Sequence, residues 1–98
     1  MIIVTSTVTR SNNTTNFYIP SAEFKQYRKT NYLDTGKMAS HEWSVIENQR
    51  ITVIKFTTTE LMNEYNNDAI VMEYSNTVNA YNTTNNIQLE KDVKYSNI

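Results

Sequence analysis

RITVIKFTTTELMNEYNND, residues 50–68, decides the fold because it joins a strand directly to a helix. Arg50–Phe56 is rich in β-branched and apolar side chains, which favour a strand. Thr57 and Glu60 have the spacing of a capping box, and Leu61 is placed to form a hydrophobic staple with the last residue of the strand. The stretch therefore predicts a strand that ends near residue 56 and a helix that is capped by Thr57.

The rest of the chain is predicted to add four strands, another helix and one or two further helical turns. Strands are expected where apolar and polar side chains alternate, or where a short apolar run lies between turn residues. Ser21 is the expected N-cap of the other helix, which should end before the turn at Gly36. In chain order, the predictions are a strand at Ile2–Arg10, a helix from Ser21 to about Leu33, strands at Lys37–Glu47 and Arg50–Phe56, the capped helix, a strand at Ala69–Tyr74, one or two helical turns at Ser75–Tyr81 and a late edge strand at Ile87–Val93.

This order of elements predicts an α+β domain. It is the ferredoxin-like βαββαβ arrangement, an antiparallel sheet with both helices on one face, followed here by a short C-terminal extension. No internal repeat or linker divides the sequence, so we expect a single domain over residues 1–98. Its core should span about residues 1–80, with residues 81–98 as the extension.

Two of the predicted strands are apolar on both faces, which predicts that the open face of the sheet is covered. A sheet with one solvated face would alternate apolar and polar side chains, and residues 50–56 and 69–74 do not. The staple assigns residues 54 and 56 to the core, so the opposite face carries Ile51 and Val53, and we expect Ala69 and Val71 beside them. These four residues are the predicted interface of a homo-oligomer, a dimer through the open sheet face, or of a subunit in a larger protein assembly.

The composition disfavours several classes of function. A net charge of −1 and a pI of about 5.7 do not attract nucleic acid. The chain has no cysteine, and its lone histidine offers no metal-ligand spacing. No apolar run approaches the roughly 20 residues of a membrane span. We therefore expect no metal, no cofactor, no nucleic-acid or membrane partner, and a cytoplasmic location.

His41 and Trp43 are the candidate ligand-binding residues. His41 is the sole histidine and is a candidate general base near neutral pH, although a partly exposed strand histidine would give the same pattern. Trp43 could line a pocket for a planar ligand or serve as a core or interface aromatic. The basic residues Lys25, Arg28 and Lys29 are interpreted as a solvated helix face. No catalytic residue is predicted beyond the candidate His41.

The order of elements and the two-faced strands resemble the dimeric α+β barrel superfamily, which includes small antibiotic-biosynthesis-monooxygenase-like proteins. The resemblance covers about residues 1–80 and involves no family-specific motif. The abundance of Asn, Ile, Lys and Tyr with a single glycine also resembles small accessory proteins of tailed phages, which would act in the host cytoplasm or the virion.

We predict from these features a non-enzymatic, self-associating interaction or accessory subunit. The alternative is a small dimeric α+β barrel enzyme or ligand binder that acts on a hydrophobic planar metabolite near His41 and Trp43.

Overall fold

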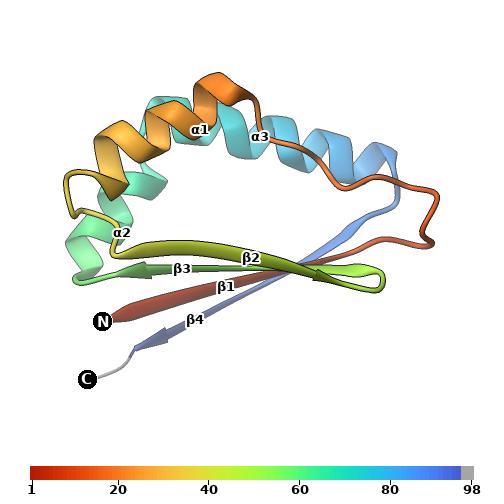
Figure 1. Ribbon diagram of the computed structural model, residues 1–98, viewed down its shortest axis with the longest axis horizontal. Helices are drawn as coiled ribbons and strands as arrows, with labels where there is room; N and C mark the ends of the chain where they lie inside the picture. The colour runs from red at the N-terminus through yellow and green to blue at the C-terminus, as the bar shows by residue number, and fades with distance from the viewer. Residues whose placement is uncertain (96–98) are drawn as a thin grey trace.

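The computed structural model describes residues 1–95, which form one four-stranded antiparallel sheet with the helices on one of its faces (Figure 1). The strands lie in the order β2-β3-β1-β4, which is the ferredoxin-like order. The α+β prediction is confirmed. The strands are β1 (Ile2–Thr9), β2 (Ser40–Ile46), β3 (Gln49–Phe56) and β4 (Gln88–Tyr95), and the helices are α1 (Ala22–Arg28), the π-helical turn η1 (Lys29–Leu33), α2 (Thr59–Asn66) and α3 (Ala69–Thr84).

The core lies between the sheet and the helices. Residues that are directly opposite in an antiparallel pair share a face, and the register pairs Ile2 with Phe56 and Val4 with Ile54. This face meets the helices through a cluster of buried side chains, and the largest fully buried ones are Phe56 and Met38. The core cluster consists of Ile2, Val4, Phe24, Tyr32, Met38, Phe56, Met62, Tyr65 and Val71.

The first helix begins where the sequence predicts. The Ser21 side chain accepts a hydrogen bond from the Phe24 N–H at 3.1 Å. The helix then continues as the π-helical turn η1, closed by the bond from Asp34 N–H to the Lys29 carbonyl. Gly36 follows with φ of +77°, a conformation that glycine adopts without strain.

The second helix begins one residue later than predicted. Thr58, and not Thr57, is the N-cap, and its hydroxyl accepts from the Leu61 N–H at 3.2 Å. Three consecutive threonines offer the same capping chemistry. The threonine that becomes the N-cap is set by the residue at which the strand ends and the chain turns. The spacing of a capping box does not specify that residue.

Helix α3 corrects the predicted strand at residues 69–74. Asp68 is its N-cap, accepting from the N–H groups of Ile70 and Val71 at 2.8 and 3.3 Å. A short apolar run is compatible with a buried helix as well as with a strand. Val71 is buried in the chain's own core, so the reason for expecting Ala69 and Val71 in an interface is removed.

The fourth strand is β4, the element predicted as a late edge strand. It pairs with β1 along its whole length, with Val93 opposite Val4 and Leu89 opposite Val8. The segment expected to be a C-terminal extension thus supplies the end of α3 and one edge of the sheet. The single-domain prediction is unaffected by this change.

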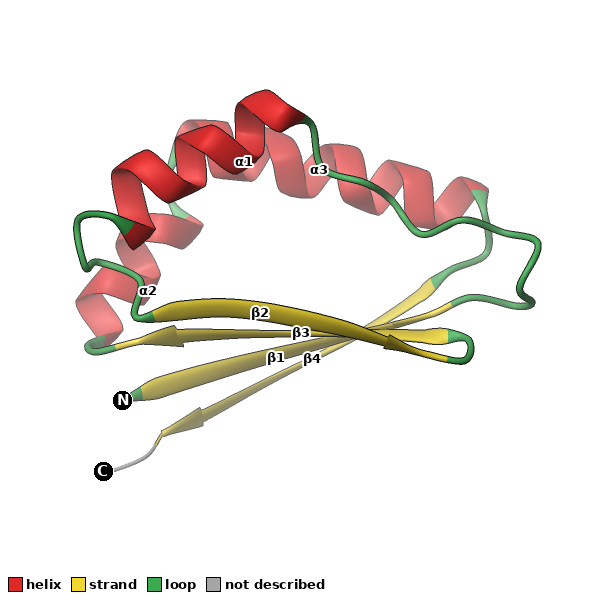
Figure 2. Cartoon of the chain, viewed as in Figure 1, coloured by secondary structure: helices red, strands yellow, loops and turns green. Residues whose placement is uncertain are grey.

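The outer face of the sheet carries Ile51 and Val53, as the sequence predicts. They lie opposite Thr7 and Thr5 of β1, on the side away from Phe56. Within residues 1–95 no helix covers this face (Figure 2). Its role as an interface stays a prediction.

Candidate ligand-binding cavity

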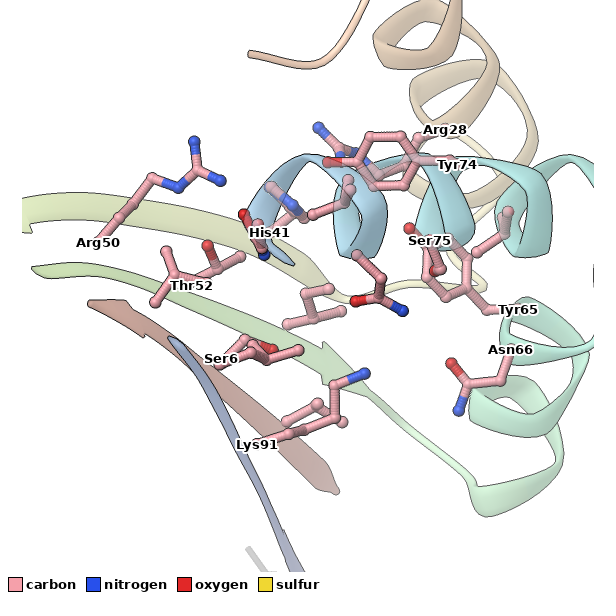
Figure 3. Close-up of a pocket in the computed structure, with 18 of the residues that line it drawn as sticks. Ser6, Arg28, His41, Arg50, Thr52, Tyr65, Asn66, Tyr74, Ser75 and Lys91 are labelled. Atoms are coloured by element: carbon pink, nitrogen blue, oxygen red, sulfur yellow. The ribbon is translucent and has the colours of Figure 1, made fainter. Parts of the chain in front are cut away.

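A cavity of about 220 Å³ lies between the inner face of the sheet and the helices (Figure 3). Side chains of all four strands line one side of it, and the end of α1 together with α2 and α3 lines the other. Its lining is mixed, with apolar residues such as Ile54 and Val71 beside arginine, histidine, tyrosine and asparagine side chains. A largely apolar hollow with a few convergent polar groups is the usual form of a small-molecule site.

His41 reaches the cavity from β2. It lies opposite Ile54 in the register, and therefore on the helix-facing side of the sheet. Burial lowers the pKa of its imidazole to about 4, and the positive charge of Arg28 contributes to the same shift. The ring is consequently neutral at pH 7, with one nitrogen able to donate a hydrogen bond and the other able to accept one.

Two half-buried arginines line the same cavity. Arg28 ends helix α1, and its guanidinium lies 5.5 Å from the centre of the Phe24 ring. Arg50 begins the inner face of β3, donates from Nη1 to the Tyr18 carbonyl and lies 5.4 Å from the Phe17 ring. Burial lowers the pKa of Arg50 below its ordinary value. The loop that precedes α1 thus holds one side of the Arg50 guanidinium and leaves its other donors for the cavity.

Among the described residues, neither arginine is paired with a carboxylate. Within residues 1–95 the ion pairs are Lys29–Asp34, Lys37–Glu64 and Lys94–Asp92, all of them at exposed side chains. The part of the lining that the structure describes includes Arg28, Arg50 and Lys91 but no aspartate or glutamate. The cavity is therefore positively charged.

Two buried nitrogen atoms at the cavity lack a hydrogen-bond partner in the described part of the chain. They are Nε of Arg28 and Nδ2 of Asn82. Asn82 lies near the end of α3 and is only 5% exposed. A buried donor without a partner is destabilising, and native structures satisfy most such groups. Both atoms belong to residues that line the cavity, although the atoms themselves lie beneath its surface.

Tyrosines complete the polar lining. Tyr74 of α3 stacks on Phe24, with ring centres 3.9 Å apart and planes 5° apart, which fixes its orientation. Burial raises the pKa of Tyr74, while the charges of Arg28 and Arg50 oppose that shift. Burial also raises the pKa of Tyr65, again opposed by Arg28. Both hydroxyls are therefore protonated at pH 7.

The structure places one of the two candidate ligand-binding residues at the cavity. His41 lines the cavity, whereas Trp43 does not and is 65% exposed on the edge strand β2. Of the basic residues around α1, Arg28 alone lines the cavity, and Lys25 and Lys29 are exposed as predicted.

Sequence reasoning missed Arg50, Tyr74 and Asn82. For Arg50 a signal was present, since it alternates with Thr52 and Ile54 on the face that the staple assigns to the core. Tyr74 and Asn82 were missed because the sequence placed Tyr74 at the end of a strand and Asn82 after the helical turns, whereas both lie on the single helix α3.

Metal and membrane features are absent from the described chain. In residues 1–95, no three His, Cys, Asp or Glu side chains are grouped so that they could hold a metal ion. Over the same residues, the helices are too short or too polar to cross a membrane.

The fold and the cavity define a ferredoxin-like α+β domain that encloses a ligand-sized space between its sheet and its helices. The structure is similar to the crystal structure of a Deinococcus radiodurans protein provisionally assigned as an antibiotic biosynthesis monooxygenase. The TM-score is 0.61 at 10% sequence identity, and the match covers 100% of this chain and 94% of the other. At this identity the likeness shows the fold. No protein-family model and no curated protein matches the sequence.

This comparison corrects the functional prediction. The chain was expected to be a non-enzymatic, self-associating accessory subunit, and the matching structure is instead one assigned to a class of small enzymes. The finding favours the alternative, a small α+β barrel enzyme or ligand binder. The resemblance to antibiotic-biosynthesis-monooxygenase-like proteins is confirmed at the level of the fold, while the phage resemblance stays a prediction.

Proposed function

We propose that this protein binds a small, hydrophobic, planar metabolite in the cavity between its sheet and its helices, as a ligand binder or an enzyme. The observation that carries the proposal is the cavity of about 220 Å³, in which apolar side chains lie beside the polar groups of His41, Arg50 and Tyr74. Small-molecule sites combine an apolar wall with a few polar groups that orient the ligand in this way.

The size of the cavity limits the ligand. An apolar cavity of about 150 Å³ is known to hold benzene. The space of about 220 Å³ therefore suits one substituted ring or a compact two-ring system. Tyr74, stacked on Phe24, offers a rigid aromatic surface at the wall, against which a planar ligand would pack.

His41 is best suited to hydrogen bonding in this site. A general base works best when its pKa is near the working pH. With a pKa of about 4, the imidazole is a weak base, and proton transfer to it from a ligand at pH 7 is unfavourable. Its neutral form is nevertheless always present, so it would orient a hydroxyl or carbonyl group of the ligand. The proposal thus gives His41 a binding role.

Amide chemical-shift mapping with a panel of planar aromatic compounds tests this function. Ser75 lines the cavity mouth on α3, whereas its exposed neighbour Asn76 does not line it. Ser75→Trp should therefore block binding, and Asn76→Trp, which adds the same bulk one residue away, should leave it intact. Shifts absent from the cavity for every compound, or equal binding by both variants, would refute the proposal.

We also propose that the protein acts as a homodimer through the outer face of the sheet. Ile51 and Val53 lie opposite Thr7 and Thr5 of β1 on that face, and Ile3 lies on the same face one pair further along, opposite Lys55. β-branched apolar side chains on a flat surface suit a self-complementary interface.

A further inference from the structure

We infer that the ligand of the cavity is an anion, a small aromatic carboxylate, and that Arg28 and Arg50 bind its carboxylate group. This inference rests on the proposed function, since it names the chemical class of the molecule that occupies the same cavity. It adds a charge and a polar anchor to a ligand that has so far been described only by its size and flatness.

The first support is the charge of the lining. Among the described residues that line the cavity, three are cationic, namely Arg28, Arg50 and Lys91, and none is anionic. His41 is neutral at pH 7 because burial lowers its pKa to about 4. Half-buried charges are normally paired, because removal from water is costly without a partner. A ligand carboxylate would supply the missing negative charge.

The second support is that three acidic side chains of the helical layer are already engaged elsewhere. Asp68 accepts from the hydroxyls of Tyr27 and Tyr32 and from the start of α3. Asp34 and Glu64 pair with lysines at the surface. The protein therefore does not neutralise Arg28 and Arg50 from within residues 1–95.

The third support is the placement of the donors. Arg50 gives Nη1 to the Tyr18 carbonyl, and a guanidinium carries five N–H donors, so further donors remain. Arg28 keeps its Nε without a partner among the described residues. Both arginines lie beside neighbours of Tyr74 (Figure 3). Arg28 lies against Phe24, which stacks on the Tyr74 ring, and Arg50 is bonded to Tyr18, whose ring contacts Tyr74 edge to face. Guanidinium groups bind carboxylates well because their planar forks match in geometry.

The ring of such a ligand would contact the apolar part of the same lining. Ile54 and Phe56 of β3 line the cavity together with Val71 and Val78 of α3. A carboxylate alone, such as acetate, would leave this surface uncovered. A neutral ring would leave both arginines unpaired. An aromatic carboxylate satisfies both parts.

Benzoate and benzamide are the probes that test the charge. They have nearly the same shape, and only benzoate is an anion at pH 7. We expect benzoate to bind the wild-type protein at least tenfold more tightly than benzamide, with amide shifts centred on the cavity. This comparison needs no variant, so it is decisive even if a substitution impairs folding.

Charge-removing variants locate the anion site. Arg28→Gln and Arg50→Gln should each weaken benzoate binding at least tenfold and leave benzamide binding within about twofold. Lys25→Gln is the matched control, because it removes the same charge from an exposed position on α1. It should leave both affinities unchanged.

The outcomes separate this inference from the proposed function. Equal binding of benzoate and benzamide in the cavity would overturn the anion site and leave the proposed function intact. Benzoate binding that is equally weakened by all three variants would reflect net charge and would also overturn the anion site. If none of the planar compounds reaches the cavity, the proposed function fails and the inference fails with it.

Discussion

The Tyr32 hydroxyl donates a hydrogen bond of 2.6 Å to Oδ2 of Asp68, and this bond joins the π-helical turn after α1 to the start of α3. Tyr27 donates to the same oxygen at 2.5 Å. The other oxygen, Oδ1, caps α3. One carboxylate therefore joins the segment formed by α1 and η1 to α3, and both α1 and α3 contribute residues to the cavity.

Replacing Asp68 should destabilise the fold. Asp68→Ala removes an N-cap, which contributes about 1 kcal/mol, and hydrogen bonds to a charged acceptor, which contribute about 1.5–3 kcal/mol each but are not additive because two of them share one oxygen. We expect a loss of about 2–4 kcal/mol in the free energy of unfolding, measured by urea denaturation. Asp92→Ala, at an exposed carboxylate of β4, should change it by less than about 0.5 kcal/mol. Similar losses in the two variants would contradict the structural role.

The same carboxylate predicts an acid-dependent loss of stability. Burial alone would raise the pKa of Asp68, but hydrogen bonds from Tyr27, Tyr32 and the backbone N–H groups of Ile70 and Val71 together lower it from the ordinary value of 3.8. A group with a lowered pKa stabilises the folded state above its unfolded pKa, and this contribution disappears as the pH falls through the folded value.

Asp68→Asn should therefore lower the free energy of unfolding most at pH 6. The difference from the wild type should shrink below pH 3.8, as the wild-type carboxylate itself becomes protonated. Urea midpoints of the wild type and of Asp68→Asn at several pH values measure this convergence. A constant difference down to pH 2 would show that the charge of Asp68 plays no part.

The lowered pKa of His41 should make the stability of the fold depend on pH in a second range, which lies above the range governed by Asp68. Its folded pKa of about 4 is lower than the unfolded value of 6.5, so the unfolded state binds the proton first. Stability should decline as the pH falls from 6.5 towards 4 and should be independent of His41 above pH 6.5. His41→Gln should flatten this decline, and the NMR titration of the His41 ring should have its midpoint near pH 4. A midpoint near 6.5 would mean that the imidazole is solvated.

The sequence predicts much of the sheet because alternation is a local pattern. Ile51 and Val53 on one side of β3, and Ile54 and Phe56 on the other, follow from the period of a strand and one staple contact. Residues 69–74 were misassigned because a continuous apolar run has no period, and the decisive signal was the capping residue Asp68 just before it.

The cavity itself was much less predictable. His41 was identified because it is unique in the chain, yet Arg28, Arg50 and Asn82 come from three separate elements. They share a site only after α3 has packed over the sheet. The sequence does not indicate that Arg28 and Arg50 have no carboxylate partner among the described residues, because ion pairs depend on the tertiary structure.

The final prediction concerns the outer face of the sheet, where Val53 lies between Thr5 and Glu42 on its two neighbouring strands. Burying a Val or Ile side chain contributes roughly 1.5–3 kcal/mol, so a few such residues from each chain are sufficient for a dimer. Val53→Lys places a charge in that interface and beside Glu42, where a cross-strand ion pair would preserve the monomer fold. We expect the wild type to sediment as a dimer at micromolar concentration and Val53→Lys to sediment as a folded monomer with an unchanged circular dichroism spectrum.

Val45→Lys is the matched control for this prediction. Val45 is half-exposed on β2 and lies on the opposite face from Val53, so the Val45→Lys variant should remain dimeric. A monomeric wild type, or equal dissociation of both variants, would refute the homodimer through this face.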